Sequence, residues 1–126
     1  MLATLTRSPI LFVDDSAVVR FAVKRRLVDR GLEVVTFASA TEAAAIRGSD
    51  FAAALLDIEL GDGLGPDLAA RLREGAPSLP IAFLTAGGPP ETLDAAARLG
   101  PVFSKASEVE DAVRWIVEAA GRAGPA

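Results

Sequence analysis

Short apolar runs alternate with longer segments of helical length and period along this chain. The runs predict five strands, at residues 9–14, 32–37, 51–57, 80–85 and 101–104. The segments between them predict five helices, at residues 16–30, 40–47, 65–74, 90–99 and 108–121. Strands that alternate with helices form βαβ units around a parallel sheet. The pattern therefore predicts the α/β class, with five βα units.

Local signals support two of the predicted helices. Ser39 and Glu42 fit a capping box, in which a hydroxyl and a carboxylate bind the free amides of the first turn. The last predicted helix carries an apolar stripe that would face the sheet, made of Val109, Ala112, Val113, Ile116, Val117 and Ala120. Trp115 falls off this stripe. It is a candidate contact residue for a partner or a cover for the helix edge.

The length of 126 residues suits one domain with its own apolar core and leaves no room for a second. We expect residues 1–121 to form this domain and residues 122–126, which are mostly small, to be a short flexible tail.

Composition excludes several functions. The chain has no cysteine and no histidine, so disulfides, thiolate or imidazole metal sites and the usual base for a nucleophilic serine are absent. A formal net charge of -4 gives no electrostatic reason to bind nucleic acid directly. The apolar runs are too short for a membrane span or a signal peptide, so we expect a cytoplasmic protein.

Four of the predicted strands end at a residue that can handle a phosphoryl group. These residues are Asp14 with Asp15, Asp57, Thr85 and Lys105. Taken alone, each is typical of a turn, a helix cap or a solvated surface. In open α/β sheets, however, ligands bind beyond the carboxyl ends of the strands. The occurrence of such residues at the ends of four strands therefore predicts that they form one site.

Three aspartates brought together would repel one another unless a cation neutralises them. Mg²⁺ is the natural cation for an all-oxygen site, because it binds one or two carboxylates and keeps positions for water and phosphate. One aspartate could then attack phosphorus to give an acyl phosphate. Lys105 and Thr85 would supply an ammonium and a hydroxyl for the phosphoryl oxygens.

With these motifs the chain resembles the receiver domain of two-component response regulators over essentially its whole length. The resemblance rests on Val13-Asp14-Asp15, Leu56-Asp57, Leu84-Thr85-Ala86, Lys105 and the loop at residues 57–68. It implies a flavodoxin-like, doubly wound sheet of strand order 2-1-3-4-5. It also implies that Asp57 is the phosphoacceptor and that Mg²⁺ is held by Asp14, Asp15, Asp57 and the backbone carbonyl of Glu59. Thr85 and Lys105 would contact the phosphoryl group.

The resemblance implies a signalling switch rather than an enzyme, although the domain would assist its own Mg²⁺-dependent phosphotransfer and dephosphorylation. The phosphoryl donor would be a histidine kinase or a histidine phosphotransfer protein, because this chain has no histidine. The added charge would change the face formed by the fourth predicted helix, the fifth strand and the fifth predicted helix. A downstream protein or output domain would read this face.

The sequence departs from the family near the fifth strand and after the third. The family carries an aromatic residue three positions before its lysine, where this chain has Val102, with Phe103 one position later. Ala106 replaces a proline that is usually cis, so we expect a trans bond after Lys105. Gly61 replaces another proline and should loosen the loop beside the phosphoacceptor.

Other functions remain open at this point. The main alternative is a receiver-like interaction module that binds its partner without a phosphorylation cycle. A small Mg²⁺-dependent phosphatase would share the carboxylate chemistry, but it usually has Asp-x-Asp where this chain has Asp57-Ile58-Glu59. A flavodoxin-type cofactor binder is disfavoured, because the first strand leads into two acids rather than a phosphate-binding loop.

The first predicted helix is rich in basic residues, which are Arg20, Lys24, Arg25, Arg26 and Arg30. Most such clusters are solvated faces. Because this helix starts beside the predicted acidic site and basic rims steer association, we hypothesise that it helps to dock the phosphodonor.

Overall fold

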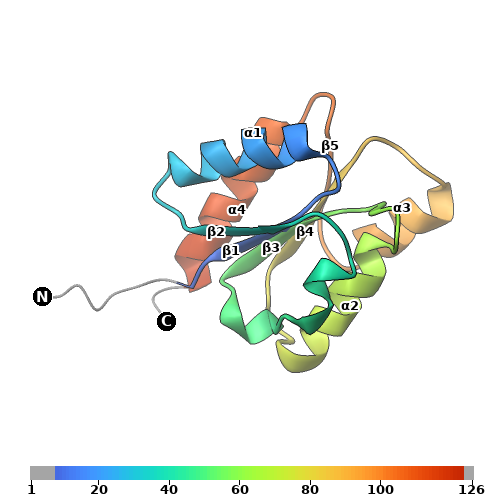
Figure 1. Ribbon diagram of the computed structural model, residues 1–126, viewed down its shortest axis with the longest axis horizontal. Helices are drawn as coiled ribbons and strands as arrows, with labels where there is room; N and C mark the ends of the chain where they lie inside the picture. Colours follow the sequence, from blue (N-terminus) through green and yellow to red (C-terminus); the bar gives the residue numbers. More distant parts are fainter. Residues whose placement is uncertain (1–7, 124–126) are drawn as a thin grey trace, which may run out of the picture.

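Five parallel strands lie side by side in the order β2-β1-β3-β4-β5, as predicted (Figure 1). The computed structural model describes residues 8–123. The strands are β1 (Ile10–Val13), β2 (Val34–Phe37), β3 (Ala53–Asp57), β4 (Ile81–Thr85) and β5 (Val102–Ser104). From β1 the chain moves to β2 on one side and then to β3 on the other. This change of direction opens a crevice at the carboxyl ends of β1 and β3.

Helices cover both faces of the sheet. They are α1 (Ala17–Val28), α2 (Gly65–Gly75), α3 (Pro90–Ala97) and α4 (Val109–Ala123). In Figure 1, α1 and α4 lie on one face, and α2 and α3 lie on the other. The predicted α-helix at 40–47 is wrong, because two short 3-10 helices, η1 (Glu42–Ala45) and η2 (Gly48–Asp50), occupy this region. Within the described residues, four α-helices therefore stand where five were predicted.

Hydrogen bonds from α2 explain why the α-helix does not form. The guanidinium of Arg71 donates to the backbone carbonyls of Ala43 at 2.8 Å and Ile46 at 3.4 Å. An α-helix would instead need the Ala43 carbonyl for the N–H four residues later. Ile46 is extended, with φ -79° and ψ 158°, and it packs against the apolar core. The capping hydrogen bond from the Glu42 N–H to Ser39 Oγ is present but opens a single turn.

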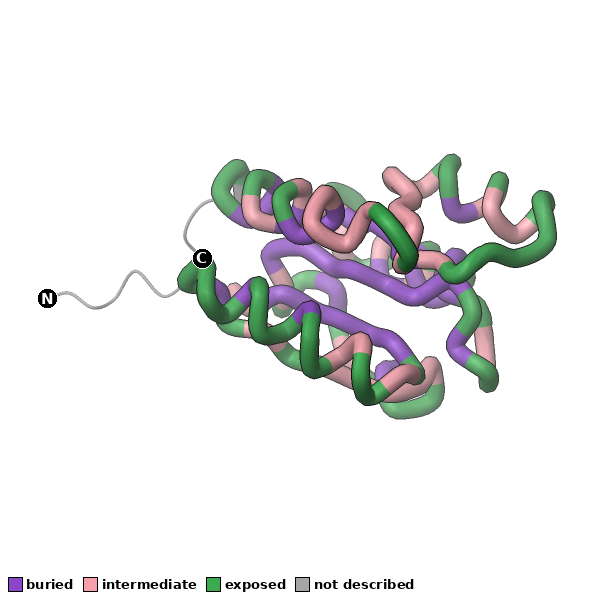
Figure 2. The backbone as a smooth tube through the Cα atoms, turned by 90° about the horizontal axis from the view of Figure 1, so that it is seen from above, coloured by how far each residue is buried: buried purple, intermediate pink, exposed green. Residues whose placement is uncertain are grey.

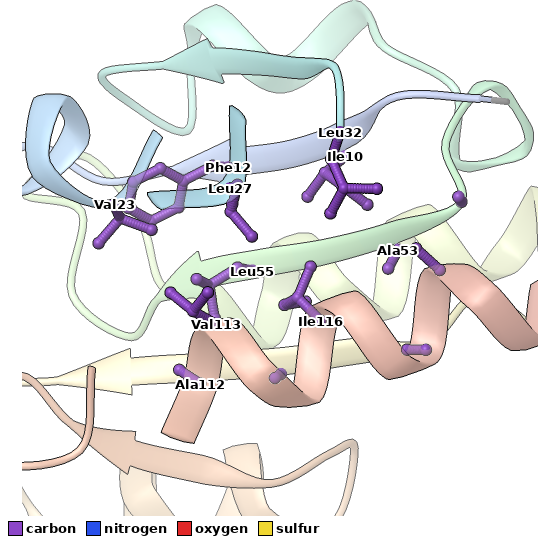
Figure 3. Close-up of a cluster of buried hydrophobic side chains, with 14 of the residues drawn as sticks. Ile10, Phe12, Val23, Leu27, Leu32, Ala53, Leu55, Ala112, Val113 and Ile116 are labelled. Carbon is purple, nitrogen blue, oxygen red and sulfur yellow. The ribbon is translucent and has the colours of Figure 1, made fainter. Parts of the chain in front are cut away.

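The three central strands, β1, β3 and β4, are buried on both faces apart from the half-buried Thr85, as expected for a parallel sheet, whereas the edge strands β2 and β5 are only partly buried (Figure 2). Alternate residues face opposite layers. Ile10, Phe12 and Leu55 pack with Val23 and Leu27 of α1 and with Val113 and Ile116 of α4, as Figure 3 shows. Their neighbours along the strands, such as Leu11, Val13 and Leu56, pack against the layer that contains α2 and α3. The two layers fix the positions of the strand ends.

The predicted stripe of α4 is confirmed. Ala112, Val113, Ile116 and Ala120 are buried in the layer with α1, and Val109 and Val117 pack against it. Trp115 is half-buried and contacts the same core. The helix continues to Ala123, two residues past its predicted end, so the predicted tail begins inside it. Residues 1–7 of the predicted domain and 124–126 of the predicted tail lie outside the described residues.

Between residues 8 and 123, the structure contains no helix with the length and apolar character needed to cross a lipid bilayer.

Candidate functional site

The predicted residues from four strand ends meet at one rim of the sheet. They are Asp14 and Asp15 after β1, Asp57 at the end of β3, Thr85 at the end of β4 and Lys105 after β5. All except Asp14 line one open cavity of about 530 Å³, together with Glu59 and residues of the loops after β3 and β4. Parallel strands end at the same rim, so the topology brings these distant residues together.

Three carboxylates form the centre of the site. One oxygen from each of Asp14, Asp15 and Asp57 lies within 4.8 Å of the others. Asp14 is fully buried and Asp57 is only 4% exposed, whereas Asp15 is exposed. The Asp14 Oδ1 accepts a hydrogen bond from the Ser16 N–H at 2.9 Å, and the Asp57 Oδ1 accepts one from the Glu59 N–H at 3.3 Å. Backbone amides at the start of the following segments therefore orient both buried carboxylates.

Lys105 balances part of this negative charge. Its Nζ lies 2.9 Å from Oδ2 of Asp14 and 3.1 Å from Oδ2 of Asp57. Burial lowers the pKa of the Lys105 ammonium, but the hydrogen bonds and attraction of the two aspartates outweigh burial and raise the pKa overall. The ammonium is therefore charged at neutral pH and is shared between two buried acids.

The pKa of the Asp57 carboxyl is raised in the folded protein. Burial, and then repulsion from Asp14, raises the pKa of Asp57 to about 6, although the hydrogen bond and charge of Lys105 oppose the rise. The carboxyl is therefore mostly ionised at pH 7 and protonated at mildly acidic pH. An ionised, buried carboxylate beside a cavity has the properties of a nucleophile.

In metal-free buffer, we expect the free energy of unfolding to fall as the pH rises from about 4 to about 6. The unfolded Asp57 carboxyl loses its proton near 3.8, whereas the folded one keeps it until about 6. The folded state binds more protons in this window, so raising the pH favours unfolding by an amount of the order of 2 kcal/mol. Asp14, Asp15 and Lys105 lie beside Asp57, and Glu59 lines the same cavity.

Chemical unfolding at a series of pH values measures this effect. Asp57→Asn cannot titrate and should flatten this part of the profile. Profiles that coincide for the wild-type protein and Asp57→Asn would contradict the assignment of the effect to this carboxyl.

The donor set fits a hard divalent cation. It consists of oxygen atoms, which Mg²⁺ prefers, and the three aspartate oxygens are close enough to share one ion. Oδ2 of Asp14 is buried and accepts no hydrogen bond from a backbone amide or a hydroxyl in the described part of the chain, so the Lys105 ammonium, 2.9 Å away, is its counter-charge. Glu59, whose backbone carbonyl is the remaining predicted ligand, lines the same cavity. These residues could therefore hold Mg²⁺.

Thr85 lines the cavity, but its hydroxyl is engaged elsewhere. It donates to the Gly87 carbonyl at 3.0 Å and accepts from the Gly87 N–H at 2.9 Å. The backbone of Thr85 is tied to the neighbouring strand end, because its carbonyl accepts from the Lys105 N–H at 2.8 Å. The hydroxyl would have to leave Gly87 to contact a group bound to Asp57.

The register of β5 determines where its side chains point. Val102 pairs with Phe83 and packs on the face that carries α2 and α3, whereas Phe103 pairs with Leu84 and packs on the opposite face with α1 and α4. The family's aromatic residue corresponds to Val102, three residues before Lys105. Phe103 lies on the opposite face of the sheet and therefore does not replace that aromatic residue. The residues from 8 to 123 include no cis peptide bond, so the bond before Ala106 is trans, as predicted.

Two residues near the site have contacts that the sequence did not reveal. Arg20, which we expected on a solvated basic face, donates from its guanidinium to the Asp14 backbone carbonyl at 2.7 Å. Asp62, in the loop after β3, binds residues that precede η1. The only sequence signal for the contact between Arg20 and the Asp14 carbonyl was that Arg20 lies one turn into the helix that follows the two acids. The Gly-Asp-Gly sequence around Asp62 signalled a tight turn.

Comparisons with known proteins agree with this geometry. A sequence model of the response regulator receiver domain matches residues 10–116. The chain is 33% identical over 94 residues to the alginate biosynthesis transcriptional regulatory protein AlgB of Pseudomonas aeruginosa. This match covers 74% of the chain and 21% of that protein, so the chain spans about a fifth of the length of this curated relative.

Two solved structures are similar at 26% sequence identity. A CheY-like response regulator receiver domain protein from Methanospirillum hungatei JF-1 gives a TM-score of 0.81 over 94% of this chain and 97% of that one. A response regulator protein from Burkholderia pseudomallei, whose crystal structure has a phosphorylated aspartic acid, a calcium ion and citrate, gives a TM-score of 0.71. That match covers 91% of this chain and 69% of the other.

Proposed function

Because this chain belongs to the response regulator receiver domain family, we propose that it is a signalling switch that accepts a phosphoryl group on Asp57 with the help of Mg²⁺. The observation that carries the proposal is the position of Asp57, which is buried beside Asp14 and paired with Lys105 at the rim of an open cavity. The phosphorylated aspartic acid and calcium ion of the Burkholderia pseudomallei protein support it.

The reaction needs a nucleophile, a group that orients this nucleophile, and positive charge to stabilise the phosphoryl oxygens. An oxygen of the Asp57 carboxylate forms a bond to phosphorus while the bond from phosphorus to the donor's imidazole nitrogen breaks, and the nitrogen keeps the electron pair. The N–H of Glu59 holds the attacking carboxylate in place. Mg²⁺ held by Asp14, Asp15, Asp57 and the Glu59 carbonyl would supply positive charge to the phosphoryl oxygens.

Phosphorylation would rearrange the contacts of Lys105 and Thr85. The Lys105 ammonium, now shared between two carboxylates, would move its contact from Asp57 to the new phosphoryl oxygens. The Thr85 hydroxyl would leave Gly87 for the same group. These two changes would bias the face formed by α3, β5 and α4, which a downstream protein or output domain would read.

Incubation with acetyl phosphate, followed by measurement of the intact mass, tests the proposal. We expect one phosphoryl group to be added to each chain with Mg²⁺ and none in excess EDTA. Absence of the addition with Mg²⁺ would overturn the proposal.

The alternative of a receiver-like module without a phosphorylation cycle rests on β5. Val102 offers a small aliphatic side chain where the family has an aromatic one, and Phe103 packs on the other face of the sheet. This module would bind its partner equally well before and after treatment with acetyl phosphate.

Helix α1 is the surface that we propose for docking the phosphodonor, a histidine kinase or histidine phosphotransfer protein. Its exposed surface carries two large apolar side chains among basic ones, because Val18 is 78% exposed and Phe21 is 70% exposed. Three of the five basic residues form contacts within the chain. Arg20 donates to the Asp14 carbonyl, and both Arg26 and Arg30 pair with Glu110 of α4. The remaining two are Lys24 and Arg25. The helix begins two residues after Asp15, so a partner on this face would reach the cavity.

We expect the double variant Phe21→Ala, Lys24→Glu to slow phosphotransfer from a cognate phosphohistidine protein by about tenfold or more, because exposed aromatic residues dominate binding energy at interfaces. Its reaction with acetyl phosphate should not change, since neither residue touches the cavity. Val35→Ala, which removes an exposed apolar side chain from β2, is the matched control. Equal transfer rates for the double variant and the wild-type protein would exclude this surface.

A further inference from the structure

The loop between β3 and α2 is folded as a very small hairpin beside the acidic site. The Leu60 N–H donates to the Gly63 carbonyl at 3.0 Å, and the Gly65 N–H donates to the Ile58 carbonyl at 2.7 Å. Gly61 in the turn has φ +83°, a backbone conformation that the proline usual at this position cannot adopt. The turn in this chain therefore depends on glycine at position 61 and differs from the proline-containing turn usual in the family.

Asp62, at the tip of this hairpin, fastens the loop to the segment that precedes η1. Its Oδ1 accepts the Ala40 N–H at 2.9 Å, and its Oδ2 accepts the Thr41 N–H at 2.9 Å and the Thr41 hydroxyl. The hydrogen bonds from Thr41, and then from Ala40, hold the pKa of Asp62 below its usual value, so the acceptor is ionised. Gly63 lies against the same segment, since a Cβ on it would be 3.0 Å from the Ala40 Cβ.

The opposite side of the hairpin faces the acids. Glu59 and Gly61 line the cavity, and a Cβ on Gly61 would lie 3.9 Å from Oδ2 of Asp15. The Glu59 N–H donates to Asp57. The hairpin is thus held between the acidic cluster on one side and the anchor formed by Asp62 on the other.

We propose that Asp62 is a positioning residue for the cation site. By tying the loop to residues 40 and 41, it keeps the Glu59 backbone beside Asp15 and Asp57. A loop with glycine on both sides of its tip would otherwise lose conformational entropy when a metal orders it, and partners that hold the ligands in place remove this cost. The inference rests on the proposed function, because it presumes that the acidic site binds Mg²⁺.

Calorimetric titration with Mg²⁺ tests this role in the full chain, because it measures affinity without any phosphorylation. Asp62→Ala removes the anchor, Asp62→Glu keeps the charge but alters the reach of the carboxylate, and Thr41→Ala removes one donor with no change of charge. Asp67→Asn removes a nearby exposed charge that forms no ion pair with the described residues, so it is the electrostatic control. Amide hydrogen exchange of residues 59–64 reports the order of the loop.

We expect Asp62→Ala and Asp62→Glu to weaken Mg²⁺ binding by about tenfold or more, with faster exchange of the loop amides. Thr41→Ala should act in the same direction by a smaller factor, and Asp67→Asn should bind like the wild-type protein. If Asp62→Ala does not fold, Asp62→Glu and Thr41→Ala decide the matter.

Two outcomes would overturn the role of Asp62. The first is wild-type affinity in both Asp62→Glu and Thr41→Ala. The second is equal weakening in Asp62→Ala and Asp67→Asn with Asp62→Glu unaffected, which would show a charge effect alone. Failure of the wild-type protein to bind Mg²⁺ would instead count against the proposed function, so the two failures are distinguishable.

Discussion

Replacement of Asp57 with asparagine is expected to abolish phosphorylation by acetyl phosphate completely. The amide has nearly the same shape as the carboxylate and can still accept the Glu59 N–H, so the local structure should persist. It is not an anion, however, and cannot attack phosphorus to form an acyl phosphate. We expect no other carboxylate to take over, because Asp14 is fully buried and, among the described residues, Lys105 pairs with Asp14 and Asp57 but not with Asp15.

Intact-mass measurement in the presence of Mg²⁺ gives the result directly. Asp50→Asn, which removes an exposed acid in η2 at the far end of the sheet, should be modified like the wild-type protein. A full phosphoryl addition in Asp57→Asn would place the acceptor elsewhere. The variant should also be more stable than the wild-type protein at pH 7 in metal-free buffer, since it removes a buried charge and the repulsion of that charge from Asp14.

Lys105→Met is expected to lower the free energy of unfolding by about 3 kcal/mol at pH 7 in EDTA. The side chain is only 16% exposed, and methionine can fill much of its space. Its loss leaves Asp14 and Asp57 without a counter-charge, and an uncompensated buried charge is strongly destabilising. Added Mg²⁺ should restore most of the lost stability, because the cation neutralises the same carboxylates.

Denaturant titrations with EDTA and with excess Mg²⁺ separate these effects. Lys24→Met, which removes an exposed lysine from α1, is the control for the change in net charge and should lower stability far less. Equal stability of Lys105→Met and Lys24→Met in EDTA would mean that the two ion pairs contribute nothing measurable.

The sequence predicted the sheet and the grouping of the acids because both depend on simple regularities. The buried strands are continuous apolar runs, and the carboxyl ends of parallel strands share a rim, so Asp14 and Asp57 meet despite their separation along the chain. Neither step requires knowledge of individual side-chain contacts.

The failures arose where distant side chains override local preference. The capping pattern at Ser39 predicted an α-helix. The guanidinium of Arg71, which donates to this segment, and the carboxylate of Asp62, which accepts from it, hold the segment in another shape, and both lie more than 20 residues away in sequence. The contact of the Thr85 hydroxyl with Gly87 and the sheet face of Phe103 depend on loop geometry and strand register. Apolar patterning alone does not specify these features.

The ammonium shared by two acids sets the formal charge of the cluster formed by the three aspartates and Lys105. Asp14, Asp15 and Asp57 contribute three negative charges, and Lys105 contributes one positive charge, so two negative charges remain when all four groups are ionised. One alkaline-earth ion cancels that sum, whereas a single sodium or potassium ion cancels half of it. Valence by itself therefore gives this cluster a preference among the common ions of a cell, before ionic radius or coordination geometry makes any difference.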